Sequence, residues 1–241
     1  MQSRPPMAGK KKKPGALRRA LRISLIVVAA GVALSLSLVI PLRWIDPVTS
    51  AFMLRDDSGR QPVLFEWADW QDVGIAPMLA VVAAEDQRFA DHFGIDFRSM
   101  QEAVRNSRNG ERLRGASTIS QQLAKNLFLW PGRSYVRKGL EAWFTVLLEL
   151  CLPKKRILEI YLNVVELGPG IYGVPAASRY FFARNASRIS DSDAALLAAV
   201  LPNPHSLQVD NPSRYVRERQ RWIIGQMQRL RREQWIIKLN D

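Results

Sequence analysis

Cysteine and histidine are scarce in this sequence, which has one cysteine, Cys151, and two histidines among 241 residues. A single cysteine excludes a disulfide within the chain, and there is no cluster of Cys and His residues at the spacing of a structural zinc site. Cys151 lies in the apolar run WFTVLLELCL, which favours a buried structural thiol over a nucleophile. Internal repeats and long linkers are also missing. The length suits one ordinary domain with a short additional segment.

Acidic residues are absent from residues 1–42, which contain eight lysines and arginines. Removing those eight from the 35 basic residues leaves 27 against 22 acidic residues, so 43–241 carries a net charge of +5 although the whole chain carries +13. The basic excess is therefore concentrated at the N-terminus. A nucleic-acid-binding patch is one interpretation of it, but its position directly before an apolar run argues against that partner.

Residues 23–42, ISLIVVAAGVALSLSLVIPL, contain no charged side chain. Twenty helical residues extend about 30 Å, the thickness of the hydrocarbon core of a bilayer. A cleaved secretory signal is the alternative, because basic residues precede its apolar region as well. That region is usually only about 7–15 residues long and is followed by a small-x-small cleavage site. We therefore interpret this run as an uncleaved membrane anchor, with Trp44 at the membrane interface.

The positive charges predict the orientation of this anchor. Under the positive-inside rule, the basic tail 1–22 stays in the cytoplasm, 23–42 forms the transmembrane helix, and 43–241 lies on the other side of the membrane.

The fold class predicted for 43–241 is mainly α, because strand signals are weak after residue 75. Residues 43–75 are expected to form an irregular, partly strand-like entry, GPGIYG a loop with positive φ angles, and 105–114 a mobile loop. Helices are predicted over Pro77–Phe89, from a cap at Ser117 to Phe128, from a cap at Ser134 to Leu152, over 153–167 and 173–183, from a Ser190/Asp193 capping box to Leu201, and from Asn211-Pro212 onwards.

The segment VVAAEDQRFADHFGID, Val81 to Asp96, contains the first candidate for chemistry. Glu85 and Asp86 follow an apolar helix directly. Two charges at an ordinary helix end would be the simplest interpretation. However, the helix is too apolar to have a solvent face, and acids at a helix C-terminus oppose the macrodipole. A carboxylate beside apolar walls has a raised pKa, which suits a general base near neutral pH. His92 is more easily explained as structural.

The segment RGASTISQQLAKN contains the second set of candidates, Ser117, Gln122 and Lys125. Gln122 and Lys125 are three positions apart and share a helix face. A solvated polar face explains any one of these residues. The predicted helix N-terminus nevertheless offers free N–H groups to an anion.

The segment PGRSYVRKGLEAW contains the third set, Arg133, Arg137, Lys138 and Glu141. Glu141 follows Arg137 by four positions and Lys138 by three. A surface salt-bridge ladder has this spacing, and so does an acid that positions a substrate or a metal beside a basic pocket. Two separated carboxylates suggest glycosyl chemistry, and the cations suggest a phosphate-bearing partner.

These segments resemble motifs of the peptidoglycan glycosyltransferase family. EDQRFADHFGID is similar to its first motif, RGASTISQQLAKNLF to its second, RKGLE to its third, and KKRILEIYLNVVELGPGIYGVPAASRYFF to its fourth and fifth. The order and spacing agree from about residue 65 to 210. One departure is Ser120, where the family more often has Thr. The chain ends without room for a transpeptidase domain, so a monofunctional member of the bacterial inner membrane is expected.

The resemblance implies a lysozyme-like fold and the polymerisation of lipid II into glycan strands by a periplasmic domain. It implies Glu85 as the catalytic base and Glu141 as the second acid, which orients cations or binds a divalent metal (Mg or Mn) that bridges the pyrophosphate. The implied partners are lipid II, the growing glycan, the bilayer and other cell-wall synthesis proteins, with no nucleic acid. Residues implied in binding the donor pyrophosphate are Lys125 and Arg133, with Ser117, Gln122, Arg137 and Lys138 as further candidates.

Two other functions remain open at the level of sequence. A lytic enzyme of similar fold would cleave peptidoglycan, although cleavage does not need the cations of 125–138. A non-catalytic cell-wall scaffold would bind partners through the membrane helix. Phe65, Trp67 and Trp70 are candidates for a membrane-contacting patch, or alternatively for core packing.

Overall fold

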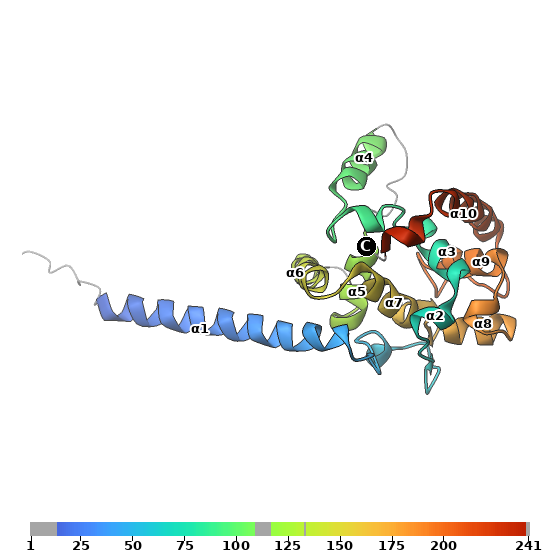
Figure 1. The fold of residues 1–241 in the computed structure, drawn as a ribbon. Helices are drawn as coiled ribbons and strands as arrows, with labels where there is room; N and C mark the ends of the chain where they lie inside the picture. Colours follow the sequence, from blue (N-terminus) through green and yellow to red (C-terminus); the bar gives the residue numbers. More distant parts are fainter. Residues whose placement is uncertain (1–13, 109–116, 133, 240–241) are drawn as a thin grey trace, which may run out of the picture. The chain divides into compact units, whose positions relative to one another are not determined.

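The computed structural model describes residues 14–108, 117–132 and 134–239, and the chain divides into two units, Met1–Leu38 and Val39–Asp241. The first unit consists mainly of helix α1, Pro14–Val39 (Figure 1). Within these described ranges, one helix, Leu17–Arg43, is long and apolar enough to cross a membrane. It contains the predicted span of 23–42. Of the loop predicted at 105–114, residues 109–114 lie outside the described residues.

The second unit is built mainly from helices, as predicted (Figure 1). Its helices are α2 (Trp70–Val73), α3 (Ile75–Glu85), α4 (Phe97–Arg108), α5 (Ile119–Phe128), α6 (Tyr135–Cys151), α7 (Lys154–Val164), α8 (Val174–Phe182), α9 (Asp191–Val200) and α10 (Arg214–Arg232). Single 3-10 turns occur at η1 (Ile40–Arg43), η2 (Met53–Arg55), η3 (Phe89–Asp91), η4 (Ala186–Arg188) and η5 (Trp235–Leu239).

Helix α3 forms the centre of this unit. Its residues 77–83 are all buried, and α7, α9 and α10 pack against it (Figure 1). A helix that is apolar on every side requires neighbours on every side, which explains this position. A second group is formed by α5, which packs between α6 and α7. The two groups share α7, so the C-terminal end of α3 and one face of α5 meet inside the unit.

A small three-stranded sheet joins the entry segment to the region after α7. Strand β1 (Leu64–Phe65) pairs in parallel with β3 (Ile171–Tyr172), and β3 pairs antiparallel with β2 (Glu166–Gly168). The predicted GPGIYG loop is therefore a β-hairpin that also receives the entry segment. The expected positive φ angles do occur at Gly170 and Gly173. At Gly173 a Cβ would lie 2.3 Å from the Asn163 carbonyl oxygen, so only glycine fits there.

Several predicted helix boundaries were correct and others were wrong. Ser134 caps α6 and Ser190 forms the predicted capping box with Asp193. The cap of α5 is Thr118 rather than Ser117, because the Thr118 hydroxyl accepts the N–H of Gln121. The last helix begins at Arg214 behind a Ser213 cap, and not at Asn211-Pro212. Helix α3 ends at Glu85 rather than at Phe89, since the backbone turns away at Asp86.

The aromatic residues of the entry segment are neither fully buried nor fully exposed. Phe65, Trp67 and Trp70 are all half-buried. The Arg156 guanidinium lies 5.3 Å above the Trp67 ring, and the Lys155 ammonium lies 5.2 Å from the Trp70 ring centre. Cations therefore lie beside these two tryptophans, and contact of Phe65, Trp67 and Trp70 with the membrane stays a prediction.

Candidate active site

The side chain of Glu85 lies at the C-terminal end of α3 and is only 13% exposed. Its two oxygens have different partners. The Gln122 amide of α5 donates to Oε2 at 2.7 Å, and the Arg219 guanidinium of α10 donates to Oε1 at 3.0 Å. Burial raises the pKa of Glu85, while the Gln122 hydrogen bond and the nearby charges of Arg219 and Lys125 act in the opposite direction. The expectation of a carboxylate enclosed by the fold rather than exposed at a helix end is therefore correct.

Gln122 is itself held in place by Tyr161 of α7. The Tyr161 hydroxyl donates to Gln122 Oε1 at 2.7 Å, and the Tyr161 side chain is completely buried. Because the amide oxygen receives this hydrogen bond, the amide nitrogen is directed to Glu85. The nearby negative charges of Glu85 and Asp86 add to burial in raising the pKa of Tyr161 well above its usual value, so the phenol remains a donor.

Asp86 has a different role from its neighbour. Its carboxylate accepts the His92 Nε2–H at 2.9 Å and the backbone N–H of Ile119 at 3.1 Å. Ile119 is the first residue of α5, so Asp86 accepts a hydrogen bond from a backbone N–H that has no partner within the helix. The Thr118 hydroxyl also donates to the Gly94 carbonyl at 2.6 Å. The segment after Glu85 is thereby tied to the helix that carries Gln122, and His92 serves this connection.

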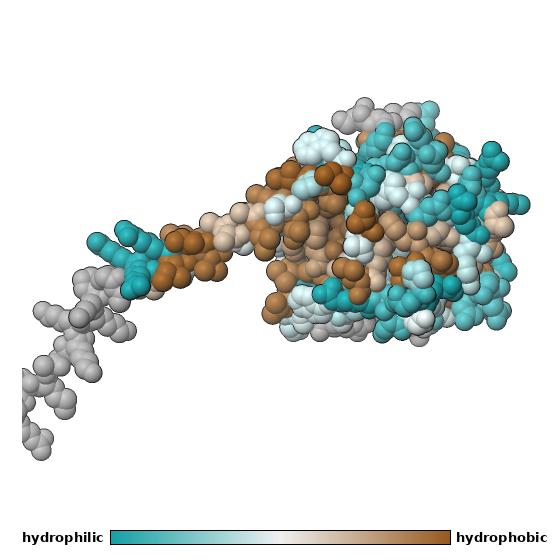
Figure 2. All heavy atoms as spheres, turned by 90° about the horizontal axis from the view of Figure 1, so that it is seen from below, coloured by the Kyte–Doolittle hydropathy of each residue, from teal (hydrophilic) through white to brown (hydrophobic). Residues whose placement is uncertain are grey.

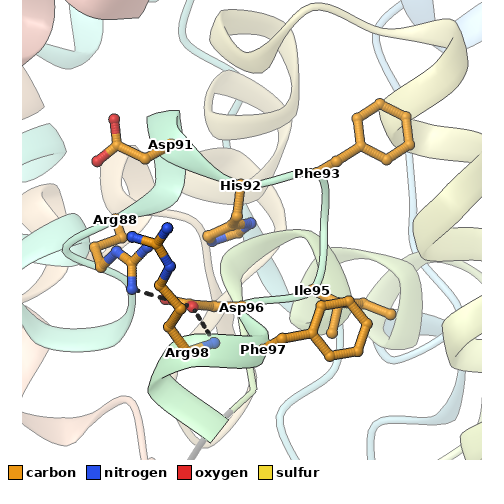
Figure 3. Close-up of a pocket in the computed structure, with 8 residues that line it drawn as sticks. All are labelled: Arg88, Asp91, His92, Phe93, Ile95, Asp96, Phe97 and Arg98. Atoms are coloured by element: carbon orange, nitrogen blue, oxygen red, sulfur yellow. Dashed lines mark hydrogen bonds and ion pairs between the residues drawn. The ribbon is translucent and has the colours of Figure 1, made fainter. Parts of the chain in front are cut away.

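The same segment lines a pocket of about 550 Å³ (Figure 3). The Asp96 carboxylate accepts the backbone N–H groups of Arg98 and Ser99 at the start of α4, and Arg88 lies 3.4 Å from it. Glu85 does not line this pocket, which therefore lies beside the candidate base rather than around it. Its lining residues are Arg88, Asp91, His92, Phe93, Ile95, Asp96, Phe97 and Arg98.

Lys125 interacts electrostatically with both acids selected from the sequence, Glu85 and Glu141. It lies one turn after Gln122 on α5, and its ammonium is 5.3 Å from the Phe52 ring centre. Burial lowers the pKa of Lys125, while the nearby charges of Glu141 and Glu85 raise it. The charges of Glu141 and Glu85 therefore both favour the protonated form of Lys125.

Glu141 on α6 is nearly fully buried, with 3% of its side chain exposed. Arg137 Nη1 donates to Oε2 at 2.9 Å and the Lys138 ammonium donates to Oε1. The predicted pairs at positions i+3 and i+4 are therefore present. They do not form a surface ladder, because the acid is inside the protein. A buried carboxylate that receives two cations is well suited to fix their positions.

The remaining predicted binding residues are less informative. Ser117 is half-buried and lies one residue before the α5 cap. Arg133 lies outside the described residues. A divalent metal at Glu141 would share the carboxylate with Arg137 and Lys138, which each donate to one of its oxygens, so the metal stays a prediction. Three other groups, Asp86, His92 and Asp96, place ligand-type atoms within 4.8 Å of one another, but hydrogen bonds from protein groups already engage both carboxylates.

Two residues of the site were missed in the sequence. Tyr161 was assigned only to the helix predicted over 153–167, and Arg219 only to the helix predicted from Asn211-Pro212 onwards. One signal for Arg219 exists in the spacing: the buried residues of α10 include Val216, Gln220 and Ile223, so Arg219 lies beside the buried stripe. Nothing in the spacing shows that this arginine meets Glu85.

The fold and the site together define a class of protein. It is a helical domain in which one buried carboxylate, Glu85, is held by an amide and a guanidinium. A second buried carboxylate, Glu141, holds two cations, and the charges of both carboxylates act on Lys125. This arrangement suits an enzyme that removes a proton and stabilises an anionic leaving group.

Comparison with known sequences identifies the family. Residues 57–228 match the family described as Transglycosylase, and the chain belongs to that family. Three relatives are each described as a biosynthetic peptidoglycan transglycosylase. The protein of Stutzerimonas stutzeri (strain A1501) is 50% identical over 205 residues, which cover 83% of this chain and 85% of the relative. Those of Pseudomonas syringae pv. tomato and Chromohalobacter salexigens are 45% and 48% identical, and cover 93% and 89% of this chain and 96% and 94% of the relatives.

Proposed function

We propose that this protein is a peptidoglycan glycosyltransferase that polymerises lipid II into glycan strands, with Glu85 as its catalytic base. The observation that carries the proposal is the environment of Glu85. It is a nearly buried carboxylate with a raised pKa, and it is close to the cation Lys125. Family membership over residues 57–228 and the descriptions of the relatives support the same activity.

In the proposed reaction, Glu85 removes the proton from the 4-hydroxyl of the acceptor sugar. The acceptor oxygen attacks the anomeric carbon of the donor from the face opposite the lipid pyrophosphate. One C–O bond forms as the bond to the pyrophosphate breaks, the electron pair leaves with the polyprenyl diphosphate, and the configuration inverts from α to β. Among the residues that the structure describes, each oxygen of Glu85 accepts one hydrogen bond, so lone pairs remain to accept the acceptor hydroxyl.

The residue inventory suits a pyrophosphate leaving group. An enzyme that cleaves a sugar–sugar bond requires a general acid, because an alkoxide leaves poorly. A pyrophosphate leaves as a stable anion and requires cations instead. We assign this role to Lys125, Arg137 and Lys138, with Glu141 holding the last two in position. Arg133, Gln122 and Ser117 remain proposed contributors, although Gln122 is already bound to Glu85.

The membrane helix suits a substrate with a polyprenyl tail. We propose a cytoplasmic tail at 1–22, an anchor at 23–42 in the inner membrane and a periplasmic catalytic domain at 43–241. Hydrophobic side chains also gather on one face of the globular unit (Figure 2). Residues outside α1 with large exposed apolar side chains include Phe97 and Met100 of α4 and Val136, Leu140 and Leu150 of α6.

Replacing Glu85 with Gln tests the proposed function. The variant keeps the shape of the side chain but removes the base, so polymerisation of labelled lipid II should fall by about 10²- to 10⁴-fold. Circular dichroism should show unchanged helix content. The matched control is Glu218→Gln, because Glu218 is a half-exposed carboxylate on α10 that pairs with Arg214.

The same assay separates the other functions. A lytic enzyme would release soluble muropeptides from purified sacculi and make no long glycan from lipid II. A non-catalytic scaffold would show no activity that depends on Glu85. Near-normal polymerisation by Glu85→Gln would remove Glu85 as the base.

A further inference from the structure

The last helix of the domain contributes a charge to the site from outside the segments that suggested the chemistry. Arg219 Nη2 lies 3.0 Å from Glu85 Oε1 and also approaches the Ala84 carbonyl oxygen at 3.4 Å. The side chain of Arg219 is only 21% exposed and that of Glu85 only 13%. The two residues are 134 positions apart in the sequence.

Packing of α10 fixes the position of Arg219. Helix α10 lies against α3 and α9, and its residues Val216, Gln220 and Ile223 are buried. The Gln220 amide donates to the Ser192 carbonyl of α9 at 2.8 Å. Arg219 is the neighbour of Gln220 on this anchored turn. Its approach to Glu85 is therefore built into helix packing and is not the contact of a free surface side chain.

We propose that Arg219 is a positioning residue for the catalytic base, which holds Oε1 of Glu85 and keeps the buried carboxylate ionised while Gln122 holds Oε2. This inference rests on the proposed function of Glu85. It extends the site to a helix that the sequence motifs leave out. It also gives the two carboxylate oxygens separate partners from two different helices, α10 and α5.

Every charged or titratable group that faces Glu85 bears on this proposal. On its own segment Asp86 follows it directly. Among the described residues, Lys125 of α5, Tyr161 of α7 and Arg219 of α10 complete the set, and Gln122 of α5 adds a neutral hydrogen-bond donor. Burial raises the pKa of Glu85 and so disfavours the ionised form that a base requires, while the Gln122 hydrogen bond and the charges of Arg219 and Lys125 oppose this effect.

Of the two cations, Arg219 is the better suited to hold the charge on Glu85. Burial lowers the pKa of Lys125, and Lys125 is shared with Glu141. A guanidinium stays charged throughout the working pH range and is more weakly hydrated than an ammonium. Arg219 is also within hydrogen-bond distance of the carboxylate, at 3.0 Å.

The test compares Arg219→Gln, Arg219→Lys and the matched control Arg221→Gln. Arg221 is an exposed arginine two positions further along α10. The pH dependence of kcat/KM for lipid II reports the free enzyme's base. In Arg219→Gln the acid limb should move to higher pH, so the loss of activity should be at least about tenfold larger at the acid end than on the alkaline plateau. Arg219→Lys should move the limb less, and Arg221→Gln should leave it unchanged.

A direct titration makes the test independent of turnover. The ¹³C signal of the Glu85 carboxyl in the detergent-solubilised full chain, assigned by its absence in Glu85→Gln, should titrate at higher pH in Arg219→Gln than in the wild type. An equal loss of activity at every pH with an unmoved titration would mean that Arg219 only supports the fold, and would overturn the proposal. If Arg219→Gln does not fold, Arg219→Met, which also removes the charge, replaces it, and an unmoved titration in that variant has the same force. Failure of the proposed function would appear separately, as active Glu85→Gln enzyme.

Discussion

At the scale of the residue, the surroundings of Glu85 act on its ionised carboxylate in two opposite directions. Removal from water raises its pKa, and the Gln122 hydrogen bond, Arg219 and Lys125 only partly offset that effect. Asp86, the next residue, instead receives His92 and the N-terminus of α5. The two adjacent carboxylates therefore have different roles: Glu85 is proposed as the base, and Asp86 links its segment to the N-terminus of α5. Their order in the sequence does not distinguish them, and their partners do.

The raised pKa of Glu85 predicts a pH dependence of stability. Because the folded state binds this proton more tightly than the unfolded state, Glu85 favours folding most below its unfolded pKa, and that contribution is lost as pH rises through the folded pKa. The free energy of unfolding of the wild type should therefore fall relative to Glu85→Gln as the pH rises from about 4, the ordinary pKa of a Glu side chain, through the raised pKa of the folded state. Denaturant unfolding in detergent at several pH values measures this difference. A difference that is constant over the range would contradict it.

At the scale of the element, the start of α5 decides whether the site is assembled. Thr118 forms a capping box with Gln121 and also donates to Gly94 of the preceding segment. The helix that follows carries both Gln122 and Lys125. A change at this cap should therefore reach the chemistry, although Thr118 itself touches no reacting group.

Thr118→Ala should lower the free energy of unfolding by about 1–2 kcal/mol and also reduce kcat. The capping box at Ser190 offers a matched control, because it caps α9 in an exposed position. Ser190→Ala should cost about 1 kcal/mol of stability and leave lipid II polymerisation unchanged. Denaturant unfolding and turnover measured on both variants decide the matter. An equal effect of the two changes on kcat would argue against a link between the α5 cap and the site.

At the scale of the whole molecule, the net positive charge is concentrated in the N-terminal segment 1–42 rather than spread over the chain. The first 42 residues contain eight basic residues and no acidic one. The basic residues all lie within 1–22, and the apolar run 23–42 follows them in the helix Leu17–Arg43. The rest of the chain carries a net charge of only +5. This division predicts a fixed orientation in the membrane.

Thiol labelling tests this orientation. In a Cys151→Ser background, a membrane-impermeant maleimide should label Ser206→Cys in intact spheroplasts, since Ser206 is exposed on the globular unit. Ser3→Cys should be labelled only after lysis, because residue 3 belongs to the basic tail that the positive-inside rule keeps in the cytoplasm. The opposite labelling pattern would reverse the proposed orientation.

The sequence by itself determined the features that depend on local pattern. These features are the apolar run, the helical periods, the Ser134 and Ser190 caps and the salt-bridge spacing around Glu141. Each depends on residues within about 20 positions of one another in the sequence. The motif resemblance also indicated Glu85 as the acid to examine. Boundaries were less secure. The end of α3 was misplaced, and Asp86 after it binds the distant N-terminus of α5. The cap of α5 was misplaced by one residue, because Ser117 and Thr118 are both suitable caps by type and only Thr118 accepts the N–H of Gln121.

Only the tertiary structure decided which side chains surround the base. Arg219 and Tyr161 lie on α10 and α7, 134 and 76 positions after Glu85, and each reaches the site because its helix packs around α3 or α5. Hydrophobic patterning shows which face of a helix is buried but not which helix it meets. The partners of a buried carboxylate are set by that packing, and with them the pKa on which the proposed chemistry depends.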